Sequence, residues 1–251
     1  MKRLSISILV LAFMSISIFG AKAEPVAPAT RSVLPVAEAT RPVLVELFTS
    51  QGCANCPKAN RFLAELAEDP NVITLSLAVD YWDYLGWKDT FAMSDFTARQ
   101  KEYGEHLRAR RPYTPQIIID GETLIKGTRQ AKIRKTINKL AETQAQGPQI
   151  SLTRENGQMR LEIAAGLAPK NGAVILIADY MPGVQQIEIA AGENEGKVLD
   201  QVNMVTRLRP IGTWNGEAVS LIIAAADAGS CVAILQEAGP GRVLAVTKLE
   251  G

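Results

Sequence analysis

The residue types that could do chemistry in this 251-residue chain meet in one short segment, Cys53-Ala54-Asn55-Cys56. Two cysteines separated by two residues can close a small disulfide ring and can exchange disulfides with another thiol. The residues before them, Val43 to Phe48, predict a buried strand, and Cys53 to Glu68 predict a helix. Free N–H groups at a helix start stabilise a thiolate. We therefore expect Cys53 to be the attacking nucleophile and Cys56, one turn further in, to resolve the mixed disulfide.

A second motif, Tyr113-Thr114-Pro115, stands before the predicted strand Gln116 to Asp120. Thioredoxin-like proteins carry a cis-proline at this place, facing the cysteine pair, and an X–Pro bond adopts the cis form at little cost. The cis bond exposes the preceding backbone for pairing with an extended substrate. We therefore expect Pro115 to lie opposite Cys53 and Thr114 to contact the substrate.

Glu46 is a charged residue inside the first predicted strand, seven residues before Cys53. Thioredoxins hold a buried carboxylate on this strand, one residue nearer to the cysteines, where it lies below the second cysteine and accepts a proton. A role as proton acceptor is therefore one hypothesis for Glu46. The alternative is a strand residue whose carboxylate simply reaches solvent.

An aromatic segment follows the second predicted strand, Val72 to Val79. It contains Tyr81, Trp82, Tyr84 and Trp87, together with Asp80, Asp83 and Asp89. Large aromatic side chains can wall a peptide or ligand groove beside the cysteines, and Tyr81, Trp82 and Trp87 are then substrate-binding residues. The same side chains could instead form a small core that covers the sheet.

Together these segments resemble a specific family. Its motifs are matched by Glu46-Leu47-Phe48-Thr49-Ser50-Gln51-Gly52-Cys53 with Cys56-Pro57, by Val79-Asp80-Tyr81-Trp82-Asp83-Tyr84-Leu85-Gly86-Trp87-Lys88-Asp89, and by Tyr113-Thr114-Pro115-Gln116. The chain is thereby similar to the DUF1223 family of secreted, thioredoxin-like domains of unknown function. The resemblance implies a thioredoxin-like fold with an appended β domain, and it implies no established reaction.

The chain departs from the pattern of this family at two places. Ala78 stands where the family leads us to expect a histidine before Val79-Asp80, and Ala54 and Asn55 stand where small serines are usual. Metal binding or proton transfer by that histidine is therefore not carried over to this chain.

The order of elements over residues 42–146 predicts an α/β domain. After the first strand, helix and second strand come a helix from about Ser94 to Arg108, a hairpin of Gln116–Asp120 and Thr123–Lys126 with Asp120-Gly121 in its turn, and a helix over Gln130–Thr143. The resulting order is β-α-β-α-β-β-α. This order and the Cys-x-x-Cys pair predict a thioredoxin-like domain.

The pattern changes at Gln144-Ala145-Gln146-Gly147-Pro148. Short apolar or alternating runs follow at Ile150–Thr153, Gln158–Ala164, Ala173–Tyr180, Gln185–Ile189, Ala218–Ala225, Cys231–Gln236 and Val243–Thr247, and turn residues such as Pro182-Gly183 separate them. Several strands at this spacing are typical of a sandwich or barrel. We therefore expect an antiparallel β-sandwich-like domain over residues 147–251.

The N-terminus predicts a targeting segment. Met1-Lys2-Arg3 is a positive start, Leu4 to Phe19 is uncharged and apolar, and Ala21-Lys22-Ala23 offers a cleavage site. These features indicate a signal peptide over residues 1–23, with an uncleaved membrane anchor as the alternative. Residues 24–41 form a flexible lead-in, and we expect a periplasmic or secreted protein without a membrane span after cleavage.

Composition excludes several classes of function. Apolar residues make up 47 %, and the net charge is +1 without a basic stretch, so nucleic acid is not an expected partner. The single histidine, His106, predicts a surface residue, and we expect neither a metal site nor a cofactor. Cys231 lies in an apolar run and predicts a buried free thiol that packs as a small hydrophobic group.

Three hypotheses remain for the function. The first is a thiol–disulfide oxidoreductase that acts on a protein or a small thiol or disulfide, with an unknown redox partner. The second is a module that handles copper(I), a soft ion suited to two thiolates. The third is a binding protein in which the disulfide between Cys53 and Cys56 is only structural.

Overall fold

The computed structural model describes residues 41–109, 111–143, 147–224 and 230–249. The predicted signal peptide, all but the last residue of the lead-in, and residues 144–146 of the predicted boundary lie outside the described residues. Within the part of the chain that is described, no helix combines the length and the apolar character needed to cross a bilayer.

The first half of the chain folds in the predicted order. Its elements are β1 (Val43–Thr49), α1 (Cys56–Ala67), β2 (Val72–Ala78), a 3-10 turn η1 (Asp83–Leu85), α2 (Ser94–His106), β3 (Gln116–Ile119), β4 (Thr123–Lys126) and α3 (Gln130–Thr143). In the β3–β4 hairpin, Asp120 and Gly121 both have positive φ, which is the geometry of the tight turn that Asp-Gly favours. The predicted β-α-β-α-β-β-α order is thus confirmed.

Side chains of β1 alternate between two different layers. Val45 and Leu47 belong to the core that α1 and α3 cover, whereas Leu44 and Phe48 belong to the core on the α2 side. This alternation follows from the two-residue period of a strand. Glu46 therefore lies on the α2 side of the sheet, opposite the helix that carries Cys56.

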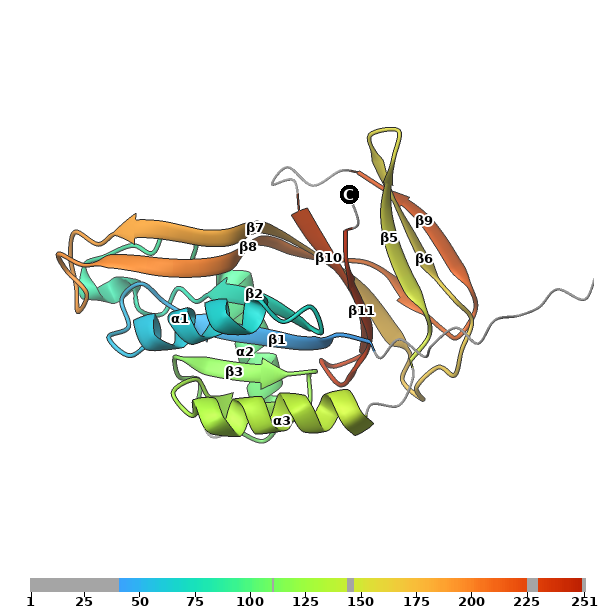
Figure 1. The fold of residues 1–251 in the computed structure, drawn as a ribbon, viewed down its shortest axis with the longest axis horizontal. Coiled ribbons are helices and arrows are strands. Elements are labelled where there is room, and N and C mark those ends of the chain that lie inside the picture. Colours follow the sequence, from blue (N-terminus) through green and yellow to red (C-terminus); the bar gives the residue numbers. More distant parts are fainter. Residues whose placement is uncertain (1–40, 110, 144–146, 225–229, 250–251) are drawn as a thin grey trace, which may run out of the picture. The chain divides into compact units, whose positions relative to one another are not determined.

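The second half adds seven strands. They are β5 (Ile150–Glu155), β6 (Gln158–Ile163), β7 (Ala173–Glu188), β8 (Val198–Trp214), β9 (Val219–Ile223), β10 (Ser230–Glu237) and β11 (Val243–Lys248). Four of them continue the sheet of the first half, in the order β11-β10-β7-β8-β2-β1-β3-β4 (Figure 1). The connection is the pairing of β8 with β2 through Met204 and Ser76.

A second sheet with the order β5-β6-β9 lies against the outer strands β7, β10 and β11 (Figure 1). Leu152 and Leu161 from this small sheet share one apolar core with Ile175 and Ala233 from the large one. This face-to-face packing is sandwich-like, as expected. The large sheet nevertheless runs across the predicted boundary after residue 146, and all described residues belong to one compact unit, so an arrangement as two separate domains is not confirmed.

The sequence analysis assigned no strand to residues 198–214, and this interpretation is wrong. β8 spans 17 residues and is paired with β7 along its length, with three register shifts. Its polar side chains and Pro210 hide the apolar run that usually reveals a strand. Likewise, Pro182-Gly183 does not separate two strands, because β7 continues through it with a register shift between Met181 and Val184.

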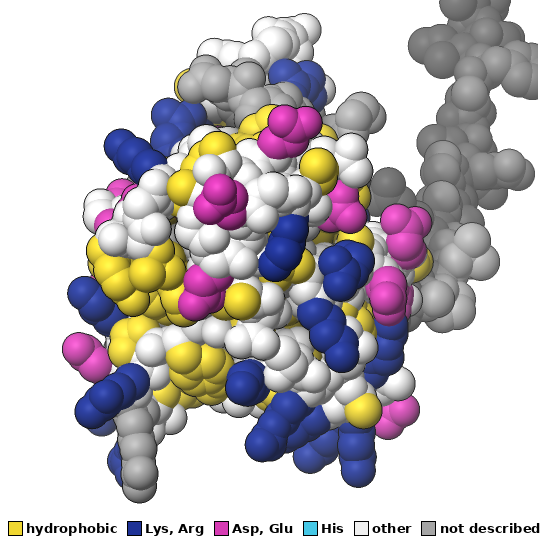
Figure 2. Space-filling model, turned by 90° about the vertical axis from the view of Figure 1, so that its left-hand side faces the viewer, with side chains coloured by type: hydrophobic (Ala, Val, Ile, Leu, Met, Phe, Trp, Pro, Cys, Tyr) yellow, Lys and Arg dark blue, Asp and Glu magenta, His cyan; other side chains and the backbone are white. Residues whose placement is uncertain are grey.

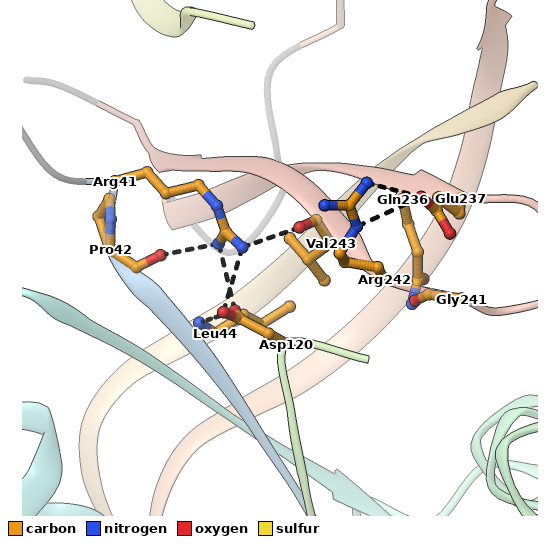
Figure 3. Close-up of polar contacts among 9 residues, drawn as sticks. All are labelled: Arg41, Pro42, Leu44, Asp120, Gln236, Glu237, Gly241, Arg242 and Val243. Atoms are coloured by element: carbon orange, nitrogen blue, oxygen red, sulfur yellow. Dashed lines mark hydrogen bonds and ion pairs between the residues drawn. The ribbon is translucent and has the colours of Figure 1, made fainter. Parts of the chain in front are cut away.

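Asp120 connects the start of β1 to the end of the large sheet (Figure 3). Its carboxylate is almost fully buried, accepts two hydrogen bonds from the Arg41 guanidinium at 3.2 and 3.1 Å, and accepts one from the Leu44 N–H at 2.8 Å. Arg41 also donates to the carbonyl of Val243 in β11 at 2.8 Å. These bonds fix the entry of β1, and β1 in turn leads to the cysteine pair.

Candidate functional site

The cysteine pair lies in the loop between β1 and α1. β1 ends at Thr49 and α1 begins at Cys56, so Cys53 lies in the turn before the helix. The expectation that the helix begins at Cys53 is wrong by three residues. The N–H of Cys53 donates to the Ser50 carbonyl at 3.2 Å, and the N–H of Cys56 donates to the Cys53 carbonyl at 3.1 Å. Both thiols are free, and their residues are only 1 % and 0 % exposed.

The two thiols have opposite tendencies to ionise. A hydrogen bond from the Cys56 thiol is the main cause that lowers the pKa of Cys53 to about 7, helped by the Thr114 hydroxyl and by backbone N–H groups, while burial opposes it. Burial is the main cause that raises the pKa of Cys56 well above its ordinary value, and Cys53 raises it further. This asymmetry is what an attacking and a resolving thiol require.

The Thr114–Pro115 peptide bond is cis, as the motif predicts. The Thr114 hydroxyl lies within hydrogen-bonding reach of the Cys53 sulfur, and it accepts a hydrogen bond from the Trp82 indole at 2.8 Å. Gly127 allows β4 to pass close to Pro115, because a Cβ at Gly127 would lie 2.9 Å from the Pro115 ring. The structure therefore brings the two predicted motifs and one predicted tryptophan together.

The aromatic segment packs partly in the core and partly beside the cysteine pair. Tyr81 and Trp82 pack against the core on the α2 side, and burial raises the pKa of Tyr81. Trp87 donates its indole N–H to the Gln51 side chain at 2.7 Å, whereas Tyr84 is 80 % exposed. Trp82 and Trp87 thus fix polar groups next to the cysteines.

Glu46 is not brought to the cysteine pair. Its carboxylate accepts hydrogen bonds from Arg99 of α2 at 2.8 and 3.2 Å and from the Tyr103 hydroxyl at 2.5 Å. Gln236 of β10 binds both Arg99 and Tyr103. Glu46 is 1 % exposed, so neither the proposed contact with Cys56 nor the alternative contact with solvent is found.

Gln51 is a site residue that the sequence analysis missed. It is fully buried, and its N–H donates to the Asp89 carboxylate at 2.7 Å. Its side chain donates to Gln201 of β8 at 3.0 Å and accepts from Trp87. Gln51 therefore joins the cysteine loop to the aromatic segment and to the second half of the chain. The signal in the sequence was its place in the first family motif, two residues before Cys53.

The tip of the β7–β8 hairpin, residues 189–197, also reaches the cysteine loop. The side-chain amide of Asn194 donates to the carbonyls of Gln51 at 2.8 Å and Cys53 at 3.1 Å. The Glu193 carboxylate accepts from the Ala54 N–H at 3.1 Å. These residues lie about 140 positions beyond the cysteines in the sequence, and the residues around them do not predict the contact.

A model of the family described as "Protein of unknown function (DUF1223)" matches residues 44–236. The chain belongs to the DUF1223 family. The family that the motifs predicted is therefore confirmed. A crystal structure of a protein from Agrobacterium tumefaciens is 29 % identical, with a TM-score of 0.74 over 86 % of this chain and 96 % of that one.

A second solved structure, a thioredoxin from Wuchereria bancrofti, is 16 % identical and covers 42 % of this chain and 84 % of its own. Its TM-score is 0.26, which does not define a common fold. No curated protein matches the chain.

The remaining candidate residues of this DUF1223 protein lie away from the cysteine pair. Cys231 is fully buried among apolar residues, its sulfur lies 3.2 Å from that of Met159, and burial raises its pKa to about 11. This is the inert thiol that was predicted. His106 ends α2 and is exposed, as predicted. Among the described residues, no three His, Cys, Asp or Glu side chains are grouped so that they could hold a metal ion.

Proposed function

We propose that this DUF1223 protein is an exported thiol–disulfide oxidoreductase with a thioredoxin-like first half, in which Cys53 attacks and Cys56 resolves. The observation that carries the proposal is the placement of two free thiols, three residues apart at the start of α1, beside the cis Thr114–Pro115 bond, and their opposite tendencies to ionise support it. Cys53 has a pKa of about 7, so about half of it is thiolate at neutral pH, while Cys56 keeps its proton. A disulfide that is merely structural has no need of this asymmetry.

In the reducing direction, the Cys53 thiolate attacks one sulfur of a substrate disulfide. A bond forms between Cys53 and that sulfur, the substrate disulfide breaks, and the second sulfur leaves as a thiolate. Cys56 then loses its proton and attacks the Cys53 sulfur. The intramolecular disulfide forms, the first substrate sulfur leaves, and two electrons have passed from the cysteine pair to the substrate. Oxidation of a substrate dithiol runs through the same mixed disulfide in reverse.

The proton of Cys56 needs an acceptor in this sequence. Glu46 is not suited to the task, because Arg99 and Tyr103 occupy its carboxylate on the opposite side of the sheet. The leaving substrate thiolate has the opposite need, since it must gain a proton. Transfer from Cys56 to that thiolate balances both, and it requires no carboxylate at the site.

Thr114 and Trp82 support the nucleophile. The hydroxyl of Thr114 has a single proton, and the Trp82 indole can only donate. Because Trp82 donates to the Thr114 oxygen, the Thr114 proton is free to point to the Cys53 sulfur. Thr114 and Pro115 also form the surface beside Cys53 that we expect an extended substrate to meet. Export rests on the signal-peptide pattern of residues 1–23.

Trapping of the mixed disulfide tests the assignment. In a Cys231→Ser background, Cys56→Ser should accumulate a mixed disulfide with a substrate such as insulin, because nothing resolves it. Cys53→Ser should accumulate none, because the remaining thiol is buried and protonated. Equal trapping by both variants, or a pair that stays oxidised in strong reductant, would refute the proposal. Stoichiometric binding of copper(I) without disulfide exchange would replace it with the metal-handling function.

A further inference from the structure

The tip of the β7–β8 hairpin binds the loop that carries the activated thiol, at the end of the molecule that faces the viewer in Figure 2. Cys53 is 1 % exposed although its neighbours Ala54 and Asn55 are exposed. Asn194 of the hairpin tip is fully buried against the cysteine loop. A substrate sulfur must approach the Cys53 sulfur in line with the bond that breaks, and the closed form leaves no room for this approach.

The tip is fastened by polar contacts that a substrate could replace. Asn194 presents an amide N–H to two backbone carbonyls, and Glu193 presents a carboxylate oxygen to a backbone N–H. An extended polypeptide presents the same two kinds of group, an amide N–H and a carbonyl oxygen. The cysteine loop therefore already binds its own tip in the way in which it could bind a polypeptide.

The tip forms a turn of its own at the end of the hairpin. Gly192 and Gly196 both have positive φ, a region where glycine alone among common residues is unstrained. The regular β7–β8 pairing ends at Glu188 and Val198, and beyond it Ile189 exchanges backbone hydrogen bonds with Lys197 and Gly196, so the tip is held by its own turn and by the contacts to the cysteine loop. The stem has its own ladder of pairs up to Glu188 and Val198, so its pairing does not depend on the contacts of the tip with the cysteine loop.

We propose that the hairpin tip, residues 189–197, is a latch that closes over Cys53 and is displaced by a polypeptide substrate, with Asn194 as its main fastening. This inference rests on the proposed function and deepens it, because it names polypeptides as the substrate class. It makes Asn194 and Glu193 the residues that decide which disulfides reach the nucleophile. The second half of the chain then controls access to the chemistry of the first half.

Alkylation of the reduced protein tests the latch without any need for disulfide exchange. The rate of Cys53 alkylation by iodoacetamide is measured against pH, so that the rate per thiolate is separated from any change in pKa. Asn194→Ala removes both hydrogen bonds to the cysteine loop, together with the one accepted from Lys197, and should raise the rate per thiolate about tenfold, because the closed form is less populated. With a maleimide that carries a long polyethylene glycol chain, Asn194→Ala should raise the rate of Cys53 alkylation by at least the same factor.

Gln186→Ala is the matched control, because Gln186 lies on the stem of the same hairpin and makes an exposed hydrogen bond to Asp200. It should leave the rate unchanged. Equal rates per thiolate in the wild type, Asn194→Ala and Gln186→Ala would overturn the latch. A faster rate in Asn194→Ala without exchange with any disulfide would keep the latch and refute the oxidoreductase function.

The substrate class is tested with a disulfide-linked peptide and hydroxyethyl disulfide. The wild type should reduce the peptide at least tenfold faster, because only the peptide can replace the contacts of the tip. Asn194→Ala should narrow this preference, because it should raise the rate of hydroxyethyl disulfide reduction more than the rate of peptide reduction. An equal rate for both substrates in the wild type would overturn the assignment to polypeptides.

Discussion

Removal of the Thr114 hydroxyl should make Cys53 a weaker nucleophile at neutral pH. Thr114→Val keeps the shape of the side chain and takes away the proton that faces the Cys53 sulfur. A hydrogen bond to a charged acceptor contributes about 1.5–3 kcal/mol. Part of this is recovered from the Cys56 thiol and the backbone N–H groups, so we expect a loss of about 1.4 kcal/mol, which raises the pKa of Cys53 by about one.

The effect on the thiolate follows from this value. With a pKa of about 7, half of Cys53 is ionised at pH 7. If the pKa rises by about one, roughly a tenth is ionised, and alkylation at pH 7 slows about fivefold while the rate at high pH stays the same. Ultraviolet absorbance of the thiolate against pH, in a Cys231→Ser background, measures the pKa directly.

The two tryptophans supply the control. Trp82→Phe removes the indole N–H that orients Thr114, and it should raise the pKa of Cys53 in the same direction but less. Trp87→Phe removes the indole N–H that binds Gln51, and it should leave that pKa unchanged. An unchanged pKa in Thr114→Val, or an equal rise in Trp87→Phe, would refute the reasoning.

Four further predictions follow from other parts of the molecule. Glu46→Gln should lower the free energy of unfolding by about 3 kcal/mol in urea titration, because Arg99 stays buried without its carboxylate, and should leave the pKa of Cys53 unchanged; a changed pKa with normal stability would restore Glu46 as a proton acceptor. Asp120→Ala should cost about 2–4 kcal/mol in the same titration by removing both hydrogen bonds of the half-buried Arg41 to the carboxylate and leaving the buried Leu44 N–H without its acceptor, and a loss below about 0.5 kcal/mol would contradict this. Iodoacetamide near neutral pH should label Cys53 before Cys56 and leave Cys231 unlabelled in the folded protein, and early labelling of Cys231 would show that its core opens. Mass spectrometry of the exported protein should find Glu24 at the N-terminus, whereas an intact Met1 in the membrane fraction would favour the anchor.

Local patterns predicted the first half of the chain well. The cysteine pair, the element order and the Thr114–Pro115 motif are all short segments whose residue types determine their conformation. The hypothesis for Glu46 was wrong because it did not take into account that the side chains of a strand alternate between its two sides. In a strand that begins at Val43, residues 44, 46 and 48 share one side, and the side of α1 belongs to residues 43, 45 and 47.

The second half resisted prediction because its strands are defined by their partners. β8 carries polar residues such as Gln201 and Asn203, which are satisfied by Gln51 and Thr74 from the first half. No local apolar pattern is needed where distant chain segments supply the hydrogen bonds. For the same reason, the contact of Asn194 with the cysteine loop cannot be read from its neighbours in sequence.

The state of Cys53 combines two properties that rarely occur together. Burial alone raises the pKa of a thiol, as it does for Cys231, yet hydrogen bonds to Cys56, Thr114 and the backbone overcome burial at Cys53. Reactive cysteines usually combine a lowered pKa with partial exposure. In a buried thiol, the hydrogen bonds that lower the pKa do not speed any reaction, because no substrate reaches the sulfur. In the proposed latch these interactions take effect when the tip opens, and the contacts of Asn194 and Glu193 with the cysteine loop are the ones that a substrate would replace.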